Sequence, residues 1–384
     1  MLIARRQMLA TVTAATAAAM LAPRIAFAKA ATERRLVFVI QRGAADGLAT
    51  LAPTGDPAYA GLRGDLAADL LGQPKLGGMF ALHPALSQVA WMYAAKQALF
   101  AHAVASPYRD RSHFDAQNVL ETGGALPYDR QDGWMNRLLG LLPAGTARGL
   151  AVSATIPTAL RGAVQVASYA PTALPEASAD LLQRVSMLYA GDPQLHGLWE
   201  EALQTRAMAG DFASGGAKGA AAAGQLVAKL MTGADSARVV MVETTGWDTH
   251  AGQRARLGNQ LTGLDAMLAA IRDGLGANWA ETLVVVATEF GRTAAVNGTG
   301  GTDHGTGSVA MLLGGTVAGG RILADWPGLA PAQLYEARDL KPTMGLDALI
   351  GGAVAAHFAL DPALAVPRLF PGSTGAAVGG LIRG

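Results

Sequence analysis

Acidic, imidazole and hydroxyl side chains gather in five short segments of the 384-residue sequence. Each segment adjoins an apolar run: QRGAADGL follows LVFVI, SPYRDRSHFDAQ follows ALFAHAV, ETTGWDTH follows VVMV, TEFGRT follows LVVVA, and NGTGGTDHGTGS precedes VAMLL. Carboxylate oxygens and imidazole nitrogens are the donors that Zn, Mn and Mg ions take from proteins. If the fold brings the five segments together, we expect a divalent-metal site there.

Two pairs of residues in these segments have spacing suited to metal binding. Asp248 and His250 are two residues apart after a strand-like run, so both side chains can point to the same side. Asp303 and His304 are adjacent and point apart, which favours His304 as a ligand and Asp303 as a residue that orients a ligand. A lone carboxylate after a strand, such as Asp46, is more often a turn former or a helix cap. The set of five segments therefore favours a site more strongly than any one residue does.

Ser112 begins a helix-like stretch, SHFDAQNVLE, which is followed by Gly123 and Gly124. The simplest interpretation is an N-cap, and Asp115 three residues later completes a weak capping-box pattern. A hydroxyl at a helix N-terminus beside a cation also loses its proton more readily, and backbone N–H groups there can hold an anionic ester. Ser112 is therefore both a predicted cap and a candidate nucleophile, and the two roles are compatible.

The apolar runs predict the strands that position these groups. They are apolar on both faces, as in buried strands of a mostly parallel sheet, and cover residues 36–40, 98–104, 239–242, 283–287 and 309–313. Helical periodicity or composition is found in residues 84–96, 112–121, 133–142, 179–189, 194–209, 219–231, 253–275 and 345–358. This alternation predicts a doubly wound α/β fold with helices on both faces of the sheet. Ligands bind such folds beyond the carboxyl ends of the strands, where the polar segments lie.

The composition is that of a folded domain, with 51% hydrophobic and 15% charged residues, and it excludes a disordered chain. A net charge of +1 without a long basic run argues against nucleic-acid binding. The sequence has no cysteine, which excludes disulfides, thiolate nucleophiles and Cys-ligated zinc. Residues 29–384 are expected to form a single domain with an insertion or cap at about residues 150–232.

Residues 1–28 have the features of a twin-arginine export signal. Arg5 and Arg6 precede a mildly apolar run that ends at Leu21, and residues 26–28 form a small-x-small cleavage site. A membrane-spanning helix, the alternative, needs about 20 apolar residues, and this run is too short. We therefore expect the twin-arginine export machinery as a partner, a periplasmic or secreted protein, and no stable membrane span.

The combined motifs resemble the exported bacterial family known as domain of unknown function 1501. The resemblance covers nearly all of the chain after residue 28 and rests on RGAADGL, SPYRDRSHFDAQ, GWMNR, GWDTH, TEFGRT, GGTDHG and DWPGL. That family looks like a remote member of the alkaline phosphatase-like superfamily, which includes sulfatases and cofactor-independent phosphoglycerate mutases. The resemblance implies one or two divalent metals at the carboxyl edge of the sheet and a Ser, Thr or formylglycine nucleophile at a helix start.

The resemblance also implies roles for individual residues. The implied metal ligands are Asp46, Asp248, His250, Glu289 and His304. Ser112 would be the nucleophile, and an ester's oxygens would be clamped by Arg109, Arg111 or Arg292. Glu289 and Phe290 replace the Asp-His pair of the superfamily, so one nitrogen ligand is missing. His113 would either restore that ligand or protonate the leaving group.

The sequence thus predicts an exported, metal-dependent hydrolase of phosphate or sulfate esters, acting on a small-molecule or glycan ester with one or two Zn, Mn or Mg ions. A transferase or mutase that moves a phosphoryl group would use the same residues. The alternative from another class is a non-catalytic exported binding or assembly protein that keeps the fold. The missing histidine of the Asp-His pair motivates that alternative.

Overall fold

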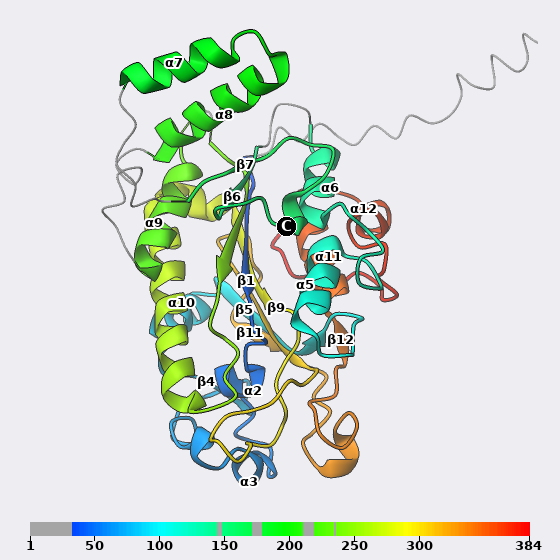
Figure 1. The fold of residues 1–384 in the computed structure, drawn as a ribbon. Coiled ribbons are helices and arrows are strands. Elements are labelled where there is room, and N and C mark those ends of the chain that lie inside the picture. The colour runs from blue at the N-terminus through cyan, green and yellow to red at the C-terminus, as the bar shows by residue number, and fades with distance from the viewer. Residues whose placement is uncertain (1–32, 144–147, 171–178, 210–218, 234–235) are drawn as a thin grey trace, which may run out of the picture.

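The computed structural model describes residues 33–143, 148–170, 179–209, 219–233 and 236–384 (Figure 1). The export signal predicted in residues 1–28 lies outside the described residues. Among the helices that are described, none has the length and apolar character needed to cross a membrane.

A nine-stranded sheet forms the centre of the molecule, in the order β11-β5-β10-β9-β1-β8-β6-β7 with β12 beside β5. Its strands are β1 (Arg35–Gln41), β5 (Ala98–Ala105), β6 (Gly149–Val152), β7 (Ala167–Ser168), β8 (Val239–Thr244), β9 (Thr282–Thr288), β10 (Ser308–Leu313), β11 (Arg321–Leu323) and β12 (Met344–Gly345). Strand β10 runs antiparallel to both β5 and β9, and the other pairs are parallel. The sheet is therefore mixed but mostly parallel.

Alternate residues of β1 point to two separate hydrophobic cores. Val37 and Val39 pack in one core, with α4 (Ser87–Ala94), α9 (Ala220–Leu230) and α10 (Gln253–Leu275). Leu36, Phe38 and Ile40 pack in the other, with α5 (His113–Thr122), α6 (Trp134–Leu141), α11 (Leu346–His357) and α12 (Pro362–Leu369). Helices cover both faces of β1, which explains why its apolar run is continuous. Figure 1 shows the two helical layers on opposite sides of the sheet.

The prediction of a doubly wound α/β fold is confirmed. The five predicted strands lie within β1, β5, β8, β9 and β10, and each of the eight predicted helical regions contains a helix. Strands β6 and β7, in the region predicted as an insertion, extend the main sheet beyond β8, and α7 (Ala179–Tyr189) and α8 (Pro193–Ala209) follow them. Residues 171–178 and 210–218 of that region lie outside the described part of the chain.

Several short elements were not expected from the sequence. They are the helices α2 (Gly47–Thr50) and α3 (Tyr59–Arg63), and a small sheet of β2 (Leu51–Ala52), β3 (Lys75–Leu76) and β4 (Phe80–Leu82). Both helices are too short to show a helical period. These elements lie between β1 and β5 along the chain, directly after the loop that follows β1.

The strand directions bring the five polar segments to one edge of the sheet. β1, β5, β8 and β9 run in the same direction, so their carboxyl ends lie at the same edge. Because β10 runs the opposite way, its first residue, Ser308, lies at that edge as well. The segments that follow four strands and precede the fifth therefore meet there, as expected for the ligand edge of such a sheet.

Candidate metal centre

Four side chains from three segments converge at this edge of the sheet. His113 begins α5, Asp248 and His250 follow β8, and His304 precedes β10. The Nε2 atom of His304 lies 2.9 Å from Nε2 of His113 and 3.1 Å from Nε2 of His250. Oδ1 of Asp248 lies 3.0 Å from Nε2 of His250 and 3.4 Å from Nε2 of His304, and Oδ2 lies 3.6 Å from Nε2 of His113. We call these four residues the donor cluster.

The other ring nitrogen, Nδ1, of each histidine has an oxygen partner. The partners are the Glu289 carboxylate for His113 at 2.8 Å, the Asp303 carboxylate for His250 at 3.0 Å and the Arg111 carbonyl for His304 at 3.1 Å. Because these oxygens accept hydrogen bonds, each Nδ1 carries a proton and each Nε2 can present its lone pair to the cluster. Histidines that ligate a metal through one nitrogen and donate to an oxygen through the other are the usual arrangement in metal sites.

Three of the four residues can share a single divalent ion, because one donor atom each from His113, Asp248 and His304 lies within 4.8 Å of the other two. Ligand atoms around a tetrahedral zinc, at metal distances of about 2.0 to 2.2 Å, lie about 3.3 to 3.6 Å apart. Five of the six separations within the donor cluster range from 2.9 to 3.6 Å, and His250 adjoins the other three residues through Asp248 and His304. Three imidazoles and one carboxylate suit zinc or manganese better than magnesium, which prefers oxygen ligands.

The donor cluster is open to solvent on one side. The side chains of Asp248 and His250 are 43% and 45% exposed, whereas those of His113 and His304 are 22% and 28% exposed. An ion bound by these residues could therefore meet a molecule that arrives from solution.

The charges around His113 and His304 differ although the two rings touch. Burial opposes ionisation of Glu289, but hydrogen bonds from His113, Gln117 and the Gly43 N–H hold the pKa of Glu289 below its ordinary value. The bond to Glu289 in turn raises the pKa of His113, against the effect of burial. Burial and the nearby His113 charge lower the pKa of His304. Without a metal, His113 therefore holds a second proton more readily than His304 does.

Replacing Glu289 with Gln is expected to lower the pKa of His113 in the metal-free protein, because the amide has no negative charge to hold the imidazolium. The raised folded pKa of His113 contributes stability below its unfolded pKa, and this contribution is lost as the pH rises through the folded pKa. The Glu289→Gln variant should lose this contribution to the free energy of unfolding at low pH. NMR titration of the imidazole signals in EDTA measures the pKa, with Glu281→Gln, at a partly exposed carboxylate, as the control. An unchanged His113 pKa would contradict the assignment.

Arg292 holds Asp248 in the donor cluster. Its guanidinium is fully buried, and Nη1 donates to Oδ1 of Asp248 at 2.7 Å. Its remaining nitrogens donate to the hydroxyl and carbonyl of Thr302. Burial opposes the charge of Asp248, but the bond from Arg292 and the neighbouring positive charges bring the pKa of Asp248 below its ordinary value. Arg292, a predicted clamp for the ester, is thus engaged with a candidate ligand.

The other two predicted clamp residues differ in their partners. Arg111 pairs with Glu336 at 2.5 Å and with Asp339 at 2.8 Å. Arg109 donates to backbone carbonyls, that of Tyr108 at 2.8 Å and that of Ser106. Of the three arginines, Arg109 is the one without a carboxylate partner among the described contacts.

Asp46 and Glu289 lie outside the donor cluster. Asp46 is 1% exposed and caps α2, because its Oδ1 accepts the Ala49 N–H at 3.1 Å. Its Oδ2 accepts from Arg63 and, at 2.5 Å, from Gln253. Both oxygens of Asp46 are therefore engaged by protein donors. Glu289 bonds the ring of His113 and supports that residue.

Ser112 occupies the N-cap position of α5 but does not cap it. Its backbone is extended, and its hydroxyl makes no hydrogen bond to an N–H of the helix. Ser112 is hydrogen-bonded to Tyr108. Asp115 bonds the Tyr108 hydroxyl at 3.2 Å, and no capping box is present at this helix. The hydroxyl is therefore adjacent in sequence to a donor-cluster residue and not committed to the helix.

Three supporting residues were not anticipated from the sequence: Gln117, Arg63 and Gln253. Gln117 lies four residues after His113, and this helical spacing places both on one face of α5, so it could have been found. Nothing in the sequence around Arg63 or Gln253 indicates their partners, which come from distant loops.

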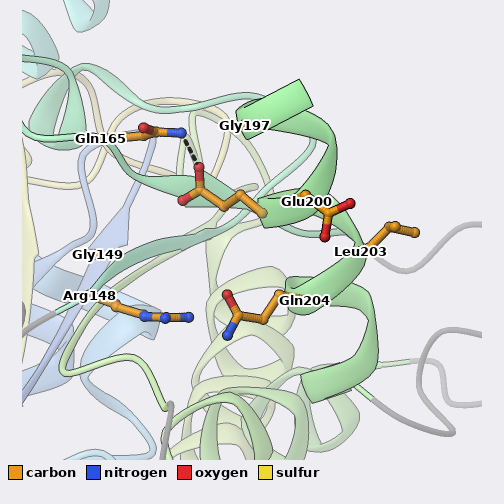
Figure 2. A pocket seen from close by; sticks show the side chains of 8 residues that line it. Arg148, Gly149, Gln165, Gly197, Glu200, Leu203 and Gln204 are labelled. Atoms are coloured by element: carbon orange, nitrogen blue, oxygen red, sulfur yellow. Dashed lines mark hydrogen bonds between the residues drawn. The ribbon is translucent and has the colours of Figure 1, made fainter. Parts of the chain in front are cut away.

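Figure 2 shows a cavity of about 810 Å³ in another part of the molecule. It is bounded by the edge of the sheet and α8, and its lining residues are Arg148, Gly149, Gln165, Gly197, Glu200, Glu201, Leu203 and Gln204. Within it Gln165 donates to Glu201 at 2.5 Å. The lining contains no histidine and no donor-cluster residue, so this cavity is not the candidate metal centre.

Comparison with known proteins gives one family match. The family model described as Protein of unknown function (DUF1501) matches residues 87–366. No curated protein matches the sequence.

Several solved structures are similar to the chain at low identity. The C-terminal periplasmic domain of EcEptC from Escherichia coli, in complex with Zn, is 9% identical, with 74% of each chain covered and a TM-score of 0.34. The lipoteichoic acid synthase LtaP from Listeria monocytogenes is 10% identical, with 91% of this chain and 75% of that chain covered and a TM-score of 0.37. The phosphonate monoester hydrolase of Agrobacterium radiobacter is 12% identical, with 89% and 79% covered and a TM-score of 0.33. Any function of this chain has to be inferred from its own residues.

Proposed function

The chain belongs to the family described as Protein of unknown function (DUF1501), and we propose that this member is an exported, metal-dependent hydrolase of phosphate or sulfate esters. The observation that supports this proposal most is the donor cluster, in which three Nε2 atoms and a carboxylate converge while each Nδ1 is held by an oxygen. A small-molecule or glycan ester is the proposed substrate class. Export by the twin-arginine route to the periplasm or the exterior is part of the proposal.

The donor cluster would hold the ion through His113, Asp248, His250 and His304. A bound divalent ion neutralises ester oxygens and makes an attacking oxygen more acidic. Glu289 and Asp303 keep the rings of His113 and His250 in place. In this arrangement Nε2 of His113 binds the ion and Nδ1 donates to Glu289. Of its two predicted roles, His113 therefore takes that of a metal ligand and does not protonate the leaving group.

Two further residues complete the proposed mechanism. The Ser112 hydroxyl attacks the phosphorus or sulfur atom and releases its proton to solvent, while the ester oxygen leaves with its bond electrons and takes a proton from solvent to become an alcohol. Water then hydrolyses the seryl ester, which restores the Ser112 hydroxyl and releases phosphate or sulfate. Arg109 donates hydrogen bonds to the remaining ester oxygens, for which it has no competing carboxylate among the described contacts.

Replacing Ser112 with Ala is expected to lower the turnover of chromogenic phosphate or sulfate esters by roughly 10³-fold or more, because the attacking oxygen is removed. Metal content should stay unchanged and thermal stability should fall only slightly, since the hydroxyl does not cap α5 and loses only its bond to Tyr108 among the described contacts. Ser168→Ala, at the far edge of the sheet, is the matched control. Full turnover by the Ser112 variant would assign the attack to another oxygen, such as that of water.

A specific observation favours the alternative, a non-catalytic exported binding or assembly protein with a structural ion. With His250 beside His113, Asp248 and His304, the centre has as many protein donors as a structural zinc site, whereas catalytic sites keep one position open. Elemental analysis of protein recovered from its native compartment, followed by a panel of chromogenic esters, separates the two functions. Stoichiometric metal without hydrolysis would support the alternative.

A further inference from the structure

We propose that Gln253 is a positioning residue that ties together the two loops of the donor cluster and thereby sets the affinity of the centre for its metal. The inference rests on the metal site proposed above. It concerns a side chain that touches none of the four candidate ligands in the described contacts.

The side-chain oxygen of Gln253 lies at the junction of two loops. Gln253 is the first residue of α10 and is fully buried. Its Oε1 accepts from the Thr249 hydroxyl at 2.9 Å and from the Thr302 hydroxyl at 2.6 Å. Thr249 lies between the candidate ligands Asp248 and His250, and Thr302 lies two residues before His304. One amide oxygen therefore joins the loop that carries two ligands to the loop that carries a third.

The Arg63–Asp46 ion pair determines which way the Gln253 amide points. Nε2 of Gln253 donates to Oδ2 of Asp46 at 2.5 Å, and the same oxygen accepts from Arg63. A carboxylate paired with an arginine can only accept, so the amide nitrogen must face Asp46 and the amide oxygen must face the two hydroxyls. Asp46, which the resemblance implied as a ligand, thus orients the Gln253 amide by accepting its N–H.

The network continues from Thr302 to a candidate ligand. The Thr302 hydroxyl accepts from Nε of Arg292 at 3.2 Å, and its carbonyl accepts from Nη2. Nη1 of Arg292 then donates to Oδ1 of Asp248 at 2.7 Å. Because the Thr302 hydroxyl donates its hydrogen bond to Gln253, the lone pairs of that hydroxyl face Arg292. Loss of Gln253 would therefore also loosen the group that orients Asp248.

Such a network affects binding because the protein orders the ligands before the ion arrives. The free energy needed to bring four side chains together is then not subtracted from binding. Partners that orient metal ligands typically contribute 10- to 100-fold to metal affinity. Because Gln253 acts through Thr249 and Thr302 and not on a ligand directly, we expect the lower end of this range.

The test is the zinc affinity of Gln253→Met, a substitution that keeps the length of the side chain and removes both hydrogen-bonding groups. The zinc Kd, measured in competition with a chromogenic chelator, should rise by about 10-fold. The visible absorption of the Co²⁺-substituted protein should also change, because the ligand positions shift. Thr262→Val, on the exposed side of the same helix, is the matched control and should change neither quantity.

Thr249→Val provides a second and milder variant, because it removes one hydroxyl and keeps the Gln253–Asp46 bond. The zinc Kd of Thr249→Val should rise as well. If Gln253→Met does not fold in EDTA, the Kd of Thr249→Val is the measurement that tests the inference. An unchanged Kd in the folded Gln253 variant, or in the Thr249 variant if the first is unfolded, would overturn the inference and leave the metal site intact. Wild-type protein that binds zinc no better than Asp248→Asn would instead overturn the proposed function.

Discussion

Replacing His304 with Gln is expected to remove the bound ion and to lower ester hydrolysis by roughly 10³-fold or more. Nε2 of His304 is the imidazole nitrogen that lies next to both of the other rings, 2.9 Å from Nε2 of His113 and 3.1 Å from Nε2 of His250, so its loss removes the donor between them. The several kcal/mol that a metal contributes to transition-state charge stabilisation correspond to a rate factor of about that size. The expected loss of turnover is as large as that of Ser112→Ala, but here the metal is lost as well.

The measurement is metal per chain by elemental analysis, together with turnover of the chromogenic ester that the wild-type protein hydrolyses. His196→Gln, at an exposed histidine of α8, is the matched control and should keep both. A His304 variant that keeps its ion would place the metal elsewhere in the chain. Full turnover in a variant that has lost its ion would remove the metal from the mechanism.

The largest effect on stability is expected for Arg63→Met, which should lower the free energy of unfolding by about 3 to 5 kcal/mol. The side chains of Arg63 and Asp46 are both fully buried. Removing the guanidinium leaves a carboxylate in the interior with only the Ala49 N–H and the Gln253 amide as donors. Urea denaturation in EDTA measures the change without a contribution from bound metal.

A surface ion pair provides the control for this variant. Arg254 pairs with Asp69 at 2.6 Å, and both side chains are at least one-third exposed. Because solvent already stabilises these charges, Arg254→Met should change the stability little. The double variant Arg63→Met with Asp46→Asn should recover part of the loss, since it removes the uncompensated charge. A small effect of Arg63→Met alone would contradict the assignment of a buried ion pair.

The Arg63–Asp46 pair also bears on the number of ions. The resemblance implies one or two divalent metals, with Asp46 among the ligands. In the structure the Arg63 guanidinium and the Gln253 amide both donate to Oδ2 of Asp46, and Glu289 accepts a hydrogen bond from the ring of His113. The donors that remain converge on one point, and we therefore propose one ion per chain.

The sequence alone determined the long strands and helices and the edge of the sheet at which the polar segments meet. Apolar runs on both faces of a strand and a helical period are local patterns, so the strands and long helices could be predicted before any contact was known. Parallel strands share a carboxyl edge, and this rule placed Asp248, His250 and His304 near one another. Short elements such as α2 and α3 escaped prediction because they have no measurable period.

Only the tertiary structure decided what each polar side chain does. Asp46 and Glu289 have the same residue types and the same positions after strands as a metal ligand would, and their spacing does not reveal that Arg63 and His113 are their partners. The choice depends on which donor approaches within about 3 Å, and these donors come from 17 and 176 residues away along the chain. Periodicity is a local property of the chain, whereas the partner of a buried charge is set by distances that exist only after folding.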